Sequence, residues 1–285
     1  MSDEIIDLHY GGRPGLVGTW LCGEQLIDCG PGSCLERLLD GLGERRPGAL
    51  MLTHIHLDHA GAAGALVERW PDLPVYVHPR GAPHLIDPSR LLASARRVFG
   101  ATLEPLLGEV RPVPQANVRT LEDGGRVGRL RSAWTPGHAS HHIAFLDDES
   151  GTAFAGDLAG VRLAAGAVVP PTPPPDIDIP RWLGSLDLLE SWQAERLALA
   201  HYGEFEHPQE QIALMREALE RHARWAGEGE GAFERALHEW LGERMNAQCV
   251  RDYEFVAMAE QSAAGLRRFL ERDGRERAPA AAERA

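Results

Sequence analysis

The stretch THIHLDHAG at residues 53–61 constrains the fold of this chain more than any other, because it sets three histidines between two regular elements. Residues 49–52 form an apolar run that predicts a short buried strand, and an alanine-rich helix is expected from there to about Trp70. An extended backbone points residues i and i+2 to the same side. His54 and His56 can therefore face one ion.

Asp58 and His59 are adjacent where the chain turns into the helix, so their side chains diverge and can serve a second ion. Imidazole and carboxylate ligands suit zinc, and also iron or manganese, in a site that keeps a position open for water. The alternatives are that Asp58 caps the helix and that the histidines form a polar cluster. None of the four cysteines lies in this motif, so the pattern favours a catalytic metal site over a structural one.

Three later motifs occur in an order that, with THIHLDHAG, resembles the signature of the metallo-β-lactamase superfamily. They are TPGHASHH at 135–142, FAGD ending at Asp157, and LALAHYG ending at Gly203. The resemblance spans residues 15 to about 205 and departs only in the last motif, which often reads GHG in the family. It implies two divalent metal ions, most often zinc. The implied ligands are His54, His56 and His138 for the first metal, Asp58, His59 and His201 for the second, and Asp157 for both.

The family's fold agrees with the element pattern, which shows two β-rich halves separated by helical segments. We expect an α/β (α+β) protein, an αββα four-layer sandwich with a C-terminal helical extension. The predicted domains are a catalytic domain at 1–206, a helical region at 207–275 and a disordered tail at 276–285. Residues 169–180 contain too many prolines for a helix or a central strand, and this loop is a candidate border of the pocket.

Four further residues bear on the site. Asp28 in LIDCGPG has a family counterpart close to the metals and is expected to orient a ligand imidazole, against the alternative of a simple turn role. His142, like Asp28, is expected to lie directly behind the metal ligands, and also to line the pocket. Asp58 and Tyr202 are the catalytic candidates, Tyr202 as a donor to a developing oxyanion or, equally, as a packing residue. No role in the site is expected for the remaining histidines, which are His9, His78, His84, His141, His207, His222 and His238.

Composition excludes several classes of function. The chain has no lysine, so Schiff-base enzymes and P-loop nucleotide binding are ruled out. A net charge of −13 disfavours a nucleic-acid substrate. No apolar run is long enough for a membrane span, and the N-terminus lacks the features of a secretory signal. We expect a cytoplasmic protein acting on a small molecule, with C-terminal helices that cover the site or form a homodimer surface.

The motif pattern is similar to that of glyoxalase II-like thioesterases and of lactonases, which implies hydrolysis of an ester, thioester or lactone, as in a hydroxyacylglutathione hydrolase. Persulfide dioxygenases of the same superfamily are the alternative, with a single iron held by the equivalents of His54, His138 and Asp157. A phosphodiesterase and a non-catalytic metal-binding protein are further alternatives. The four motifs are specific for fold and site, and the substrate is set elsewhere.

Overall fold

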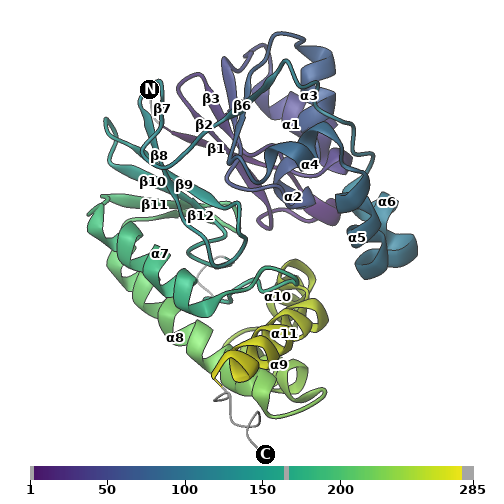
Figure 1. The fold of residues 1–285 in the computed structure, drawn as a ribbon, viewed down its shortest axis with the longest axis vertical. Helices are drawn as coiled ribbons and strands as arrows, with labels where there is room; N and C mark the ends of the chain where they lie inside the picture. The colour runs from purple at the N-terminus through teal and green to yellow at the C-terminus, as the bar shows by residue number, and fades with distance from the viewer. Residues whose placement is uncertain (1–2, 164–166, 278–285) are drawn as a thin grey trace, which may run out of the picture.

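Two sheets lie face to face in the computed structural model, which describes residues 3–163 and 167–277 (Figure 1). Each sheet has six strands in this described part, and each comes from one half of the chain. The first, in the order β1-β2-β3-β4-β5-β6, contains Glu4–Asp7, Gly18–Cys22, Gln25–Ile27, Ala49–Met51, Val75–Val77 and Val118–Thr120. The second, in the order β12-β11-β10-β9-β8-β7, contains, from β12 to β7, Gly203–Phe205, Arg196–Leu199, Thr152–Gly156, Ile143–Asp147, Leu130–Trp134 and Arg126–Val127.

Strand direction brings the motifs together. In the second sheet β8 and β10 both pair antiparallel with β9, and β10 pairs parallel with β11, so β8, β10 and β11 run the same way. Their carboxyl ends therefore share one edge of the sheet, and His138, Asp157 and His201 lie just beyond these ends. In the first sheet β3 to β6 are parallel, and THIHLDHAG follows the end of β4.

Apolar side chains fill the space between the sheets. Trp20 on β2 packs edge to face on Phe154 of β10, with ring centroids 5.9 Å apart. Its indole N–H donates to the carbonyl of Leu199 at 3.0 Å, which ties the first sheet to the end of β11. Strands buried on both faces in this way need no polar alternation.

Helices form the outer layers, with α1 and α3 against the first sheet and α7 against the second (Figure 1). The predicted four-layer sandwich is therefore confirmed. The first-half helices are α1 Leu35–Leu42, α2 Leu57–Ala60, α3 Ala63–Arg69, α4 Ala82–Ile86, α5 Ser89–Phe99 and α6 Leu103–Leu107. The second-half helices are α7 Ile179–Ser191, α8 Pro208–Gly227, α9 Ala232–Gly242, α10 Ala247–Ala257 and α11 Ala259–Arg277. Short 3₁₀ turns occur at Tyr10–Gly12, Gly32–Cys34 and Gly100–Thr102.

The predicted C-terminal helical region is divided into separate helices near its end. The side chain of Asn246 accepts the backbone N–H groups of Gln248 and Cys249, which caps the start of α10. Met258 has a φ of 50°, so the chain turns there before α11 begins. Helix α11 ends at Arg277, which is also the last residue that the structure describes. The predicted tail at 276–285 therefore lies mostly outside the described residues.

The proline-rich stretch 169–178 forms a loop ahead of α7, and Pro171 and Pro173–Pro175 line a large cavity, as expected for a loop that borders the pocket. This loop is held on α11 by Thr172, whose backbone N–H donates to the Ser262 hydroxyl at 3.2 Å. Among the described helices, none combines the length and apolar character needed to cross a membrane.

Candidate metal centre

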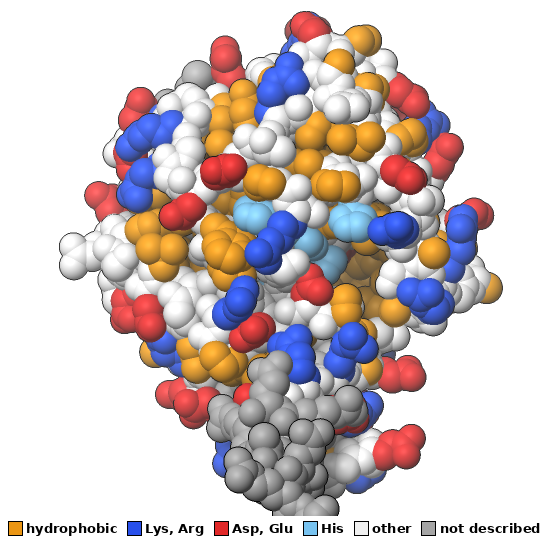
Figure 2. Space-filling model, in the orientation of Figure 1, with side chains coloured by type: hydrophobic (Ala, Val, Ile, Leu, Met, Phe, Trp, Pro, Cys, Tyr) orange, Lys and Arg blue, Asp and Glu red, His pale blue; other side chains and the backbone are white. Residues whose placement is uncertain are grey.

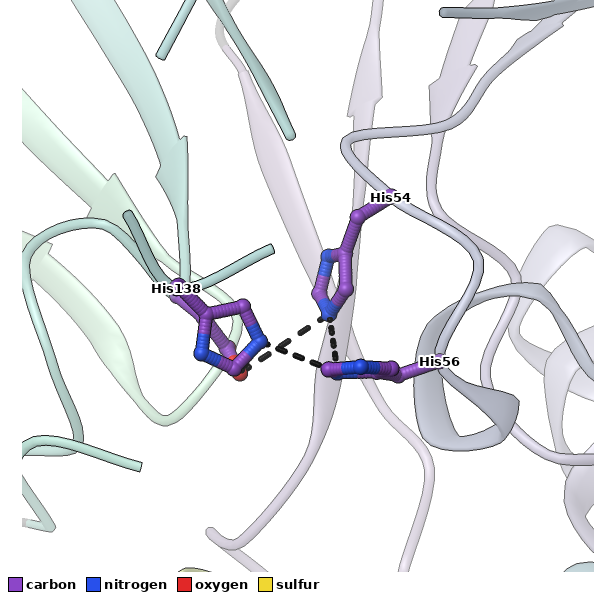
Figure 3. A group of neighbouring side chains, drawn as sticks. His54, His56 and His138 are labelled. Atoms are coloured by element: carbon purple, nitrogen blue, oxygen red, sulfur yellow. Dashed lines mark hydrogen bonds and ion pairs between the residues drawn. The ribbon is translucent and has the colours of Figure 1, made fainter. Parts of the chain in front are cut away.

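Three histidine rings meet with their nitrogens facing one another. His54 Nε2 lies 3.1 Å from His56 Nδ1, and His138 Nε2 lies 2.9 Å from the same His56 nitrogen (Figure 3). His54 and His56 come from the loop between β4 and α2, and His138 from the loop after β8. These rings form, with Asp157, a first group whose ligand atoms all lie within 4.8 Å of one another.

A second group lies beside the first. It contains Asp58 and His59, at the start of α2, and His201, just after β11. Asp58 Oδ2 lies 3.8 Å from His59 Nε2 and 3.5 Å from His201 Nε2, and the two imidazole nitrogens are 3.2 Å apart. Each of these side chains points its ligand atom into the same small volume.

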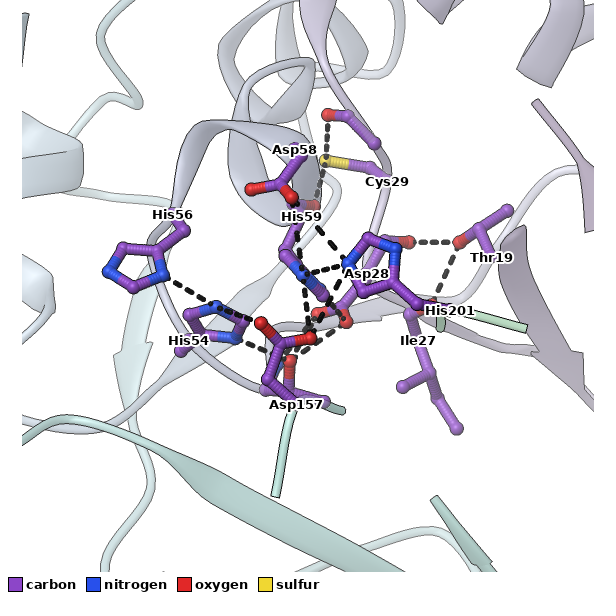
Figure 4. A network of polar contacts seen from close by, with 12 residues as sticks. Thr19, Ile27, Asp28, Cys29, His54, His56, Asp58, His59, Asp157 and His201 are labelled. Carbon is purple, nitrogen blue, oxygen red and sulfur yellow. Dashed lines mark hydrogen bonds and ion pairs between the residues drawn. The ribbon is translucent and has the colours of Figure 1, made fainter. Parts of the chain in front are cut away.

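Asp157 lies between the two groups and offers one oxygen to each (Figure 4). Its Oδ2 is 3.3 Å from His138 Nε2 and 3.9 Å from His54 Nε2. Its Oδ1 is 3.2 Å from His59 Nε2 and 3.4 Å from His201 Nε2. Since Asp157 follows Gly156 at the end of β10, the strand itself positions this carboxylate.

The donor set fits divalent cations. A neutral imidazole has one N–H and one bare nitrogen. Nδ1 of His59 faces a carboxylate and Nδ1 of His201 faces a carbonyl, so in the neutral rings both Nε2 atoms, 3.2 Å apart, are bare and suit a shared cation. Asp157 Oδ1 is buried and has no hydrogen-bond partner among the described residues. Imidazole nitrogen and carboxylate oxygen, without thiolate, match the ligands of catalytic zinc and of iron or manganese.

The opposite nitrogen of four of the five rings, all but His56, is held by the protein. His59 Nδ1 lies 2.9 Å from Asp28 Oδ2, and His54 Nδ1 lies 3.0 Å from the Thr53 hydroxyl. The carbonyl of Pro171 is 2.9 Å from His138 Nδ1, and that of Leu16 is 2.9 Å from His201 Nδ1. Such contacts fix the tautomer and the ring direction of a metal ligand, and Asp28 takes the orienting place predicted for it.

Electrostatics separate the two groups of histidines. Burial lowers the pKa of His54 and His138, and it lowers the pKa of His56 to about 4 with a smaller contribution from His138. These rings are therefore neutral near pH 7, as ligands must be. Burial opposes charge on His59 and His201 too, but the adjacent carboxylates outweigh it and raise the pKa of both rings.

Two residues predicted for the site lie elsewhere. Tyr202 does not line the cavity: its ring packs beside Gly15 and Gly18, because His201 turns inward and its neighbour then points away. Burial and Asp7 raise the pKa of the Tyr202 phenol, so the proposed oxyanion donor faces a carboxylate instead of the centre. The prediction that His142 lines the pocket is also wrong. Its ring is fully buried and accepts the backbone N–H of Asp157 at 3.3 Å.

His141 takes the place expected for its neighbour. It lines the cavity above the first group, with its ring stacked 6.3 Å from that of His54, and its Nδ1 is buried with no partner in the described part of the chain. Sequence reasoning missed it because TPGHASHH carries two adjacent histidines, and only the turn after His138 decides which one faces inward. Burial lowers the pKa of His141 to about 3.

The two groups open into a cavity of about 450 Å³. His56, Asp58, His138, Asp157 and His201 form its floor. In the space-filling view histidine side chains are visible in a hollow with arginines and apolar side chains around it (Figure 2). A substrate can therefore reach both groups from one side.

Comparison with known proteins agrees with this site. The two sheets and the paired histidine–aspartate groups are those of a metal-binding hydrolase fold. The family model of the metallo-beta-lactamase superfamily matches residues 25–201, and the chain belongs to that superfamily. The residues of all four motifs that carry the two groups fall within this match.

Two solved structures share the fold. That of the archaeal metallo-beta-lactamase superfamily protein ST1585 from Sulfolobus tokodaii superposes with a TM-score of 0.68 at 23% identity, covering 93% of this chain and 98% of that one. The metallo-beta-lactamase family protein TTHA1429 from Thermus thermophilus gives a TM-score of 0.63 at 21% identity, with 95% and 94% covered. Both cover the C-terminal helices as well as the sandwich.

Sequence relatives point to hydrolases. The metallo-beta-lactamase fold-containing protein ST1585 of Sulfurisphaera tokodaii is 30% identical over 197 residues, 64% of this chain and 71% of that protein. The probable metallo-hydrolase YflN of Bacillus subtilis is 35% identical over 117 residues, 38% of this chain and 43% of its own length. A hydroxyacylglutathione hydrolase of Xylella fastidiosa is 31% identical over 127 residues, which are 45% of this chain and 38% of that protein. This chain thus spans less than half of the last two proteins.

Proposed function

We propose that this protein hydrolyses an ester, thioester or lactone with the help of two divalent cations, zinc being the expected metal. The observation that supports the proposal most is the placement of Asp157, whose two oxygens face two separate histidine groups. A carboxylate in that position can bridge two ions. Both groups also lie at the floor of one cavity.

His54 Nε2, His56 Nδ1 and His138 Nε2 would hold the first cation with Asp157 Oδ2. The second would be held by Asp58 Oδ2, His59 Nε2, His201 Nε2 and Asp157 Oδ1. Two bridged cations, when bound, lower the pKa of a shared water toward neutrality and polarise the scissile carbonyl. No serine or cysteine nucleophile is then needed.

The protein's own groups set the geometry of the reaction. Burial opposes ionisation of Asp58, but His59 and His201 outweigh it and keep the pKa of this carboxyl below its ordinary value. Its side chain is 28% exposed, so Asp58 is both a ligand and a carboxylate that meets the substrate. His141, neutral near pH 7, can offer a ring N–H to a substrate oxygen at the first group.

Hydrolysis balances without any further reactant. The water oxygen forms a bond to the acyl carbon, and the bond from that carbon to sulfur or oxygen breaks. One water proton passes to the leaving thiolate or alkoxide, and the acid product releases the other at neutral pH. The metals, Asp58 and His141 return unchanged.

The second group also bears on the main alternative. A persulfide dioxygenase would use one iron at the first group and would leave Asp58, His59 and His201 without a function. Here those three converge as closely as the first group does, and Asp28 holds His59 from behind. This favours hydrolysis with two metals.

Metal content and turnover test the proposal together. Protein purified without added metal is analysed by mass spectrometry for metals, then assayed against thioesters, esters, lactones and phosphodiesters. Two ions per chain with turnover of an acyl substrate support the proposal. One iron per chain, with oxygen uptake on a persulfide and no hydrolysis, overturns the proposal. Turnover of phosphodiesters alone also overturns it and would indicate a phosphodiesterase.

A further inference from the structure

The upper part of the cavity is lined by apolar side chains that the proposed reaction does not use. They come from two elements far apart in sequence, α5 on one side and the junction of α10 and α11 on the other. Beyond the metal-facing floor, the walls include Leu91, Val98, Phe99, Phe255, Val256 and Met258.

Helix α5 turns an apolar stripe toward this space. The cavity-lining residues of α5 recur at helical spacing and are mostly apolar, while Arg96 and Arg97 are exposed. They are Leu91, Ala95, Val98 and Phe99, with Arg90 and Ser94 as the polar members. Val98 is 36% exposed, and no other large hydrophobic side chain among the described residues is as exposed. A single exposed valine is ordinary, but this one continues a stripe that faces a cavity.

The opposite wall is fixed in place. Met258 ends α10 in a left-handed conformation, so the chain reverses and presents Phe255 and Met258 to the cavity. The ring of Phe255 packs on Tyr10 with centroids 5.2 Å apart, and the Arg13 guanidinium lies 4.6 Å above it. The wall is therefore preformed, as in most small-molecule sites.

We propose that these two walls hold the alkyl chain of the substrate, so that the enzyme prefers acyl esters or thioesters with a medium-length, unbranched acyl group. This inference rests on the proposed hydrolysis at the metal centre and adds the class of acyl group. A small hydroxylated acyl group would leave Leu91, Val98 and Met258 in contact with water. An alkyl chain covers them, and each buried methylene is worth about fourfold in affinity.

The test compares butanoyl and octanoyl thioesters of one thiol, N-acetylcysteamine, with the metal-loaded full chain. The octanoyl thioester is expected to have a kcat/KM on the order of a hundredfold higher. Val98→Asp places a charge in the apolar stripe and should reduce this ratio at least about tenfold. Ala93→Asp is the matched control, because Ala93 is exposed on the same helix and does not line the cavity. Its ratio should equal that of the wild type.

Binding of the non-hydrolysable S-octyl and S-butyl thioethers of the same thiol, measured by calorimetry, separates this inference from the proposed reaction. Tighter binding of the octyl compound to the wild type than to Val98→Asp supports the alkyl site even if no thioester is hydrolysed. Equal kcat/KM for both thioesters, with equal binding of both thioethers, overturns the alkyl site and leaves the hydrolase proposal standing. Equal losses in Val98→Asp and Ala93→Asp also overturn it.

Discussion

Asp28 Oδ2 lies 2.9 Å from His59 Nδ1, and the other oxygen of the same carboxylate accepts the backbone N–H of Thr53 at 2.8 Å. One side chain therefore orients a histidine of the second group and the loop that carries His54 from the first. Asp28 has a φ of 60°, which a short polar residue tolerates better than most. Both groups thus depend on a residue that faces neither ion.

Asp28→Asn should weaken metal binding while leaving the fold intact. Asparagine keeps the size and the left-handed backbone but offers His59 a weaker, neutral partner. Loss of such an outer contact lowers metal affinity by about tenfold to a hundredfold. Competition with a chromophoric chelator measures this for each ion, and we expect the second site to empty first because its His59 loses a charged partner. Unchanged affinity at both sites would show that Asp28 serves only the turn.

Asp157→Asn should remove the bridge between the groups. An amide offers one neutral oxygen where two anionic oxygens stood, so we expect loss of at least one metal per chain and of most hydrolytic activity. Asp176→Asn is the control, since Asp176 also lines the cavity but accepts from the Ser140 hydroxyl at 2.6 Å and belongs to neither group. Full metal content and full activity in Asp157→Asn would contradict the assignment of the bridge.

Replacing His222 with leucine should stabilise the protein. This ring on α8 is fully buried against Trp225 and Phe233, and neither of its nitrogens has a hydrogen-bond partner among the described residues. Leaving a buried polar group unpaired costs about 1–3 kcal/mol. His222→Leu should therefore raise the free energy of unfolding by an amount in that range at pH 7, measured by urea denaturation.

The same substitution should make the free energy of unfolding less sensitive to pH below neutrality. Burial, with a smaller effect of Arg221, lowers the pKa of His222 to about 3 in the folded protein. An unfolded chain takes up this proton near pH 6.5, so the stability of the wild type falls as pH drops from 6.5 toward 3, by up to about 1.4 kcal/mol per pH unit. The gain from His222→Leu should thus grow by about 2 kcal/mol between pH 7 and pH 5. Stability curves of His222→Leu and of the wild type that stay parallel between pH 7 and pH 5 would refute the explanation.

Gly265→Ala should disturb the cavity without replacing any residue of the metal centre. A Cβ at this position of α11 would lie 2.0 Å from the carbonyl oxygen of Thr172, so the proline-rich loop must shift. We expect a raised KM for the acyl substrate and, because the adjacent Pro171 carbonyl holds His138 Nδ1, weaker metal binding at the first group. Gly184→Ala on α7 meets no atom within 4 Å and should instead stabilise the protein by up to about 1 kcal/mol. Equal KM values for the two variants would contradict a role for this close contact.

The sequence predicted the sandwich and brought seven side chains to one place because each motif follows the end of a strand, where local periodicity is clear. Local sequence patterns do not predict contacts between segments that are distant in the sequence. Tyr202 was placed in the site because it adjoins His201, yet a side chain next to an inward-facing one points away. Phe255 lies nearly two hundred residues after THIHLDHAG in the sequence. No local pattern around it predicts that it lines the cavity.

The cavity wall at the junction of α10 and α11 has a consequence for how this protein can change. All residues of the two groups that would hold the cations lie between 54 and 201, and one of the two apolar walls lies beyond 250. If the proposed function holds, substitutions in that later stretch would alter which acyl groups fit and would leave every residue of the two groups unchanged. Part of the choice of substrate would then be carried by a stretch of chain that contributes nothing to the metal centre, while α5 carries the rest.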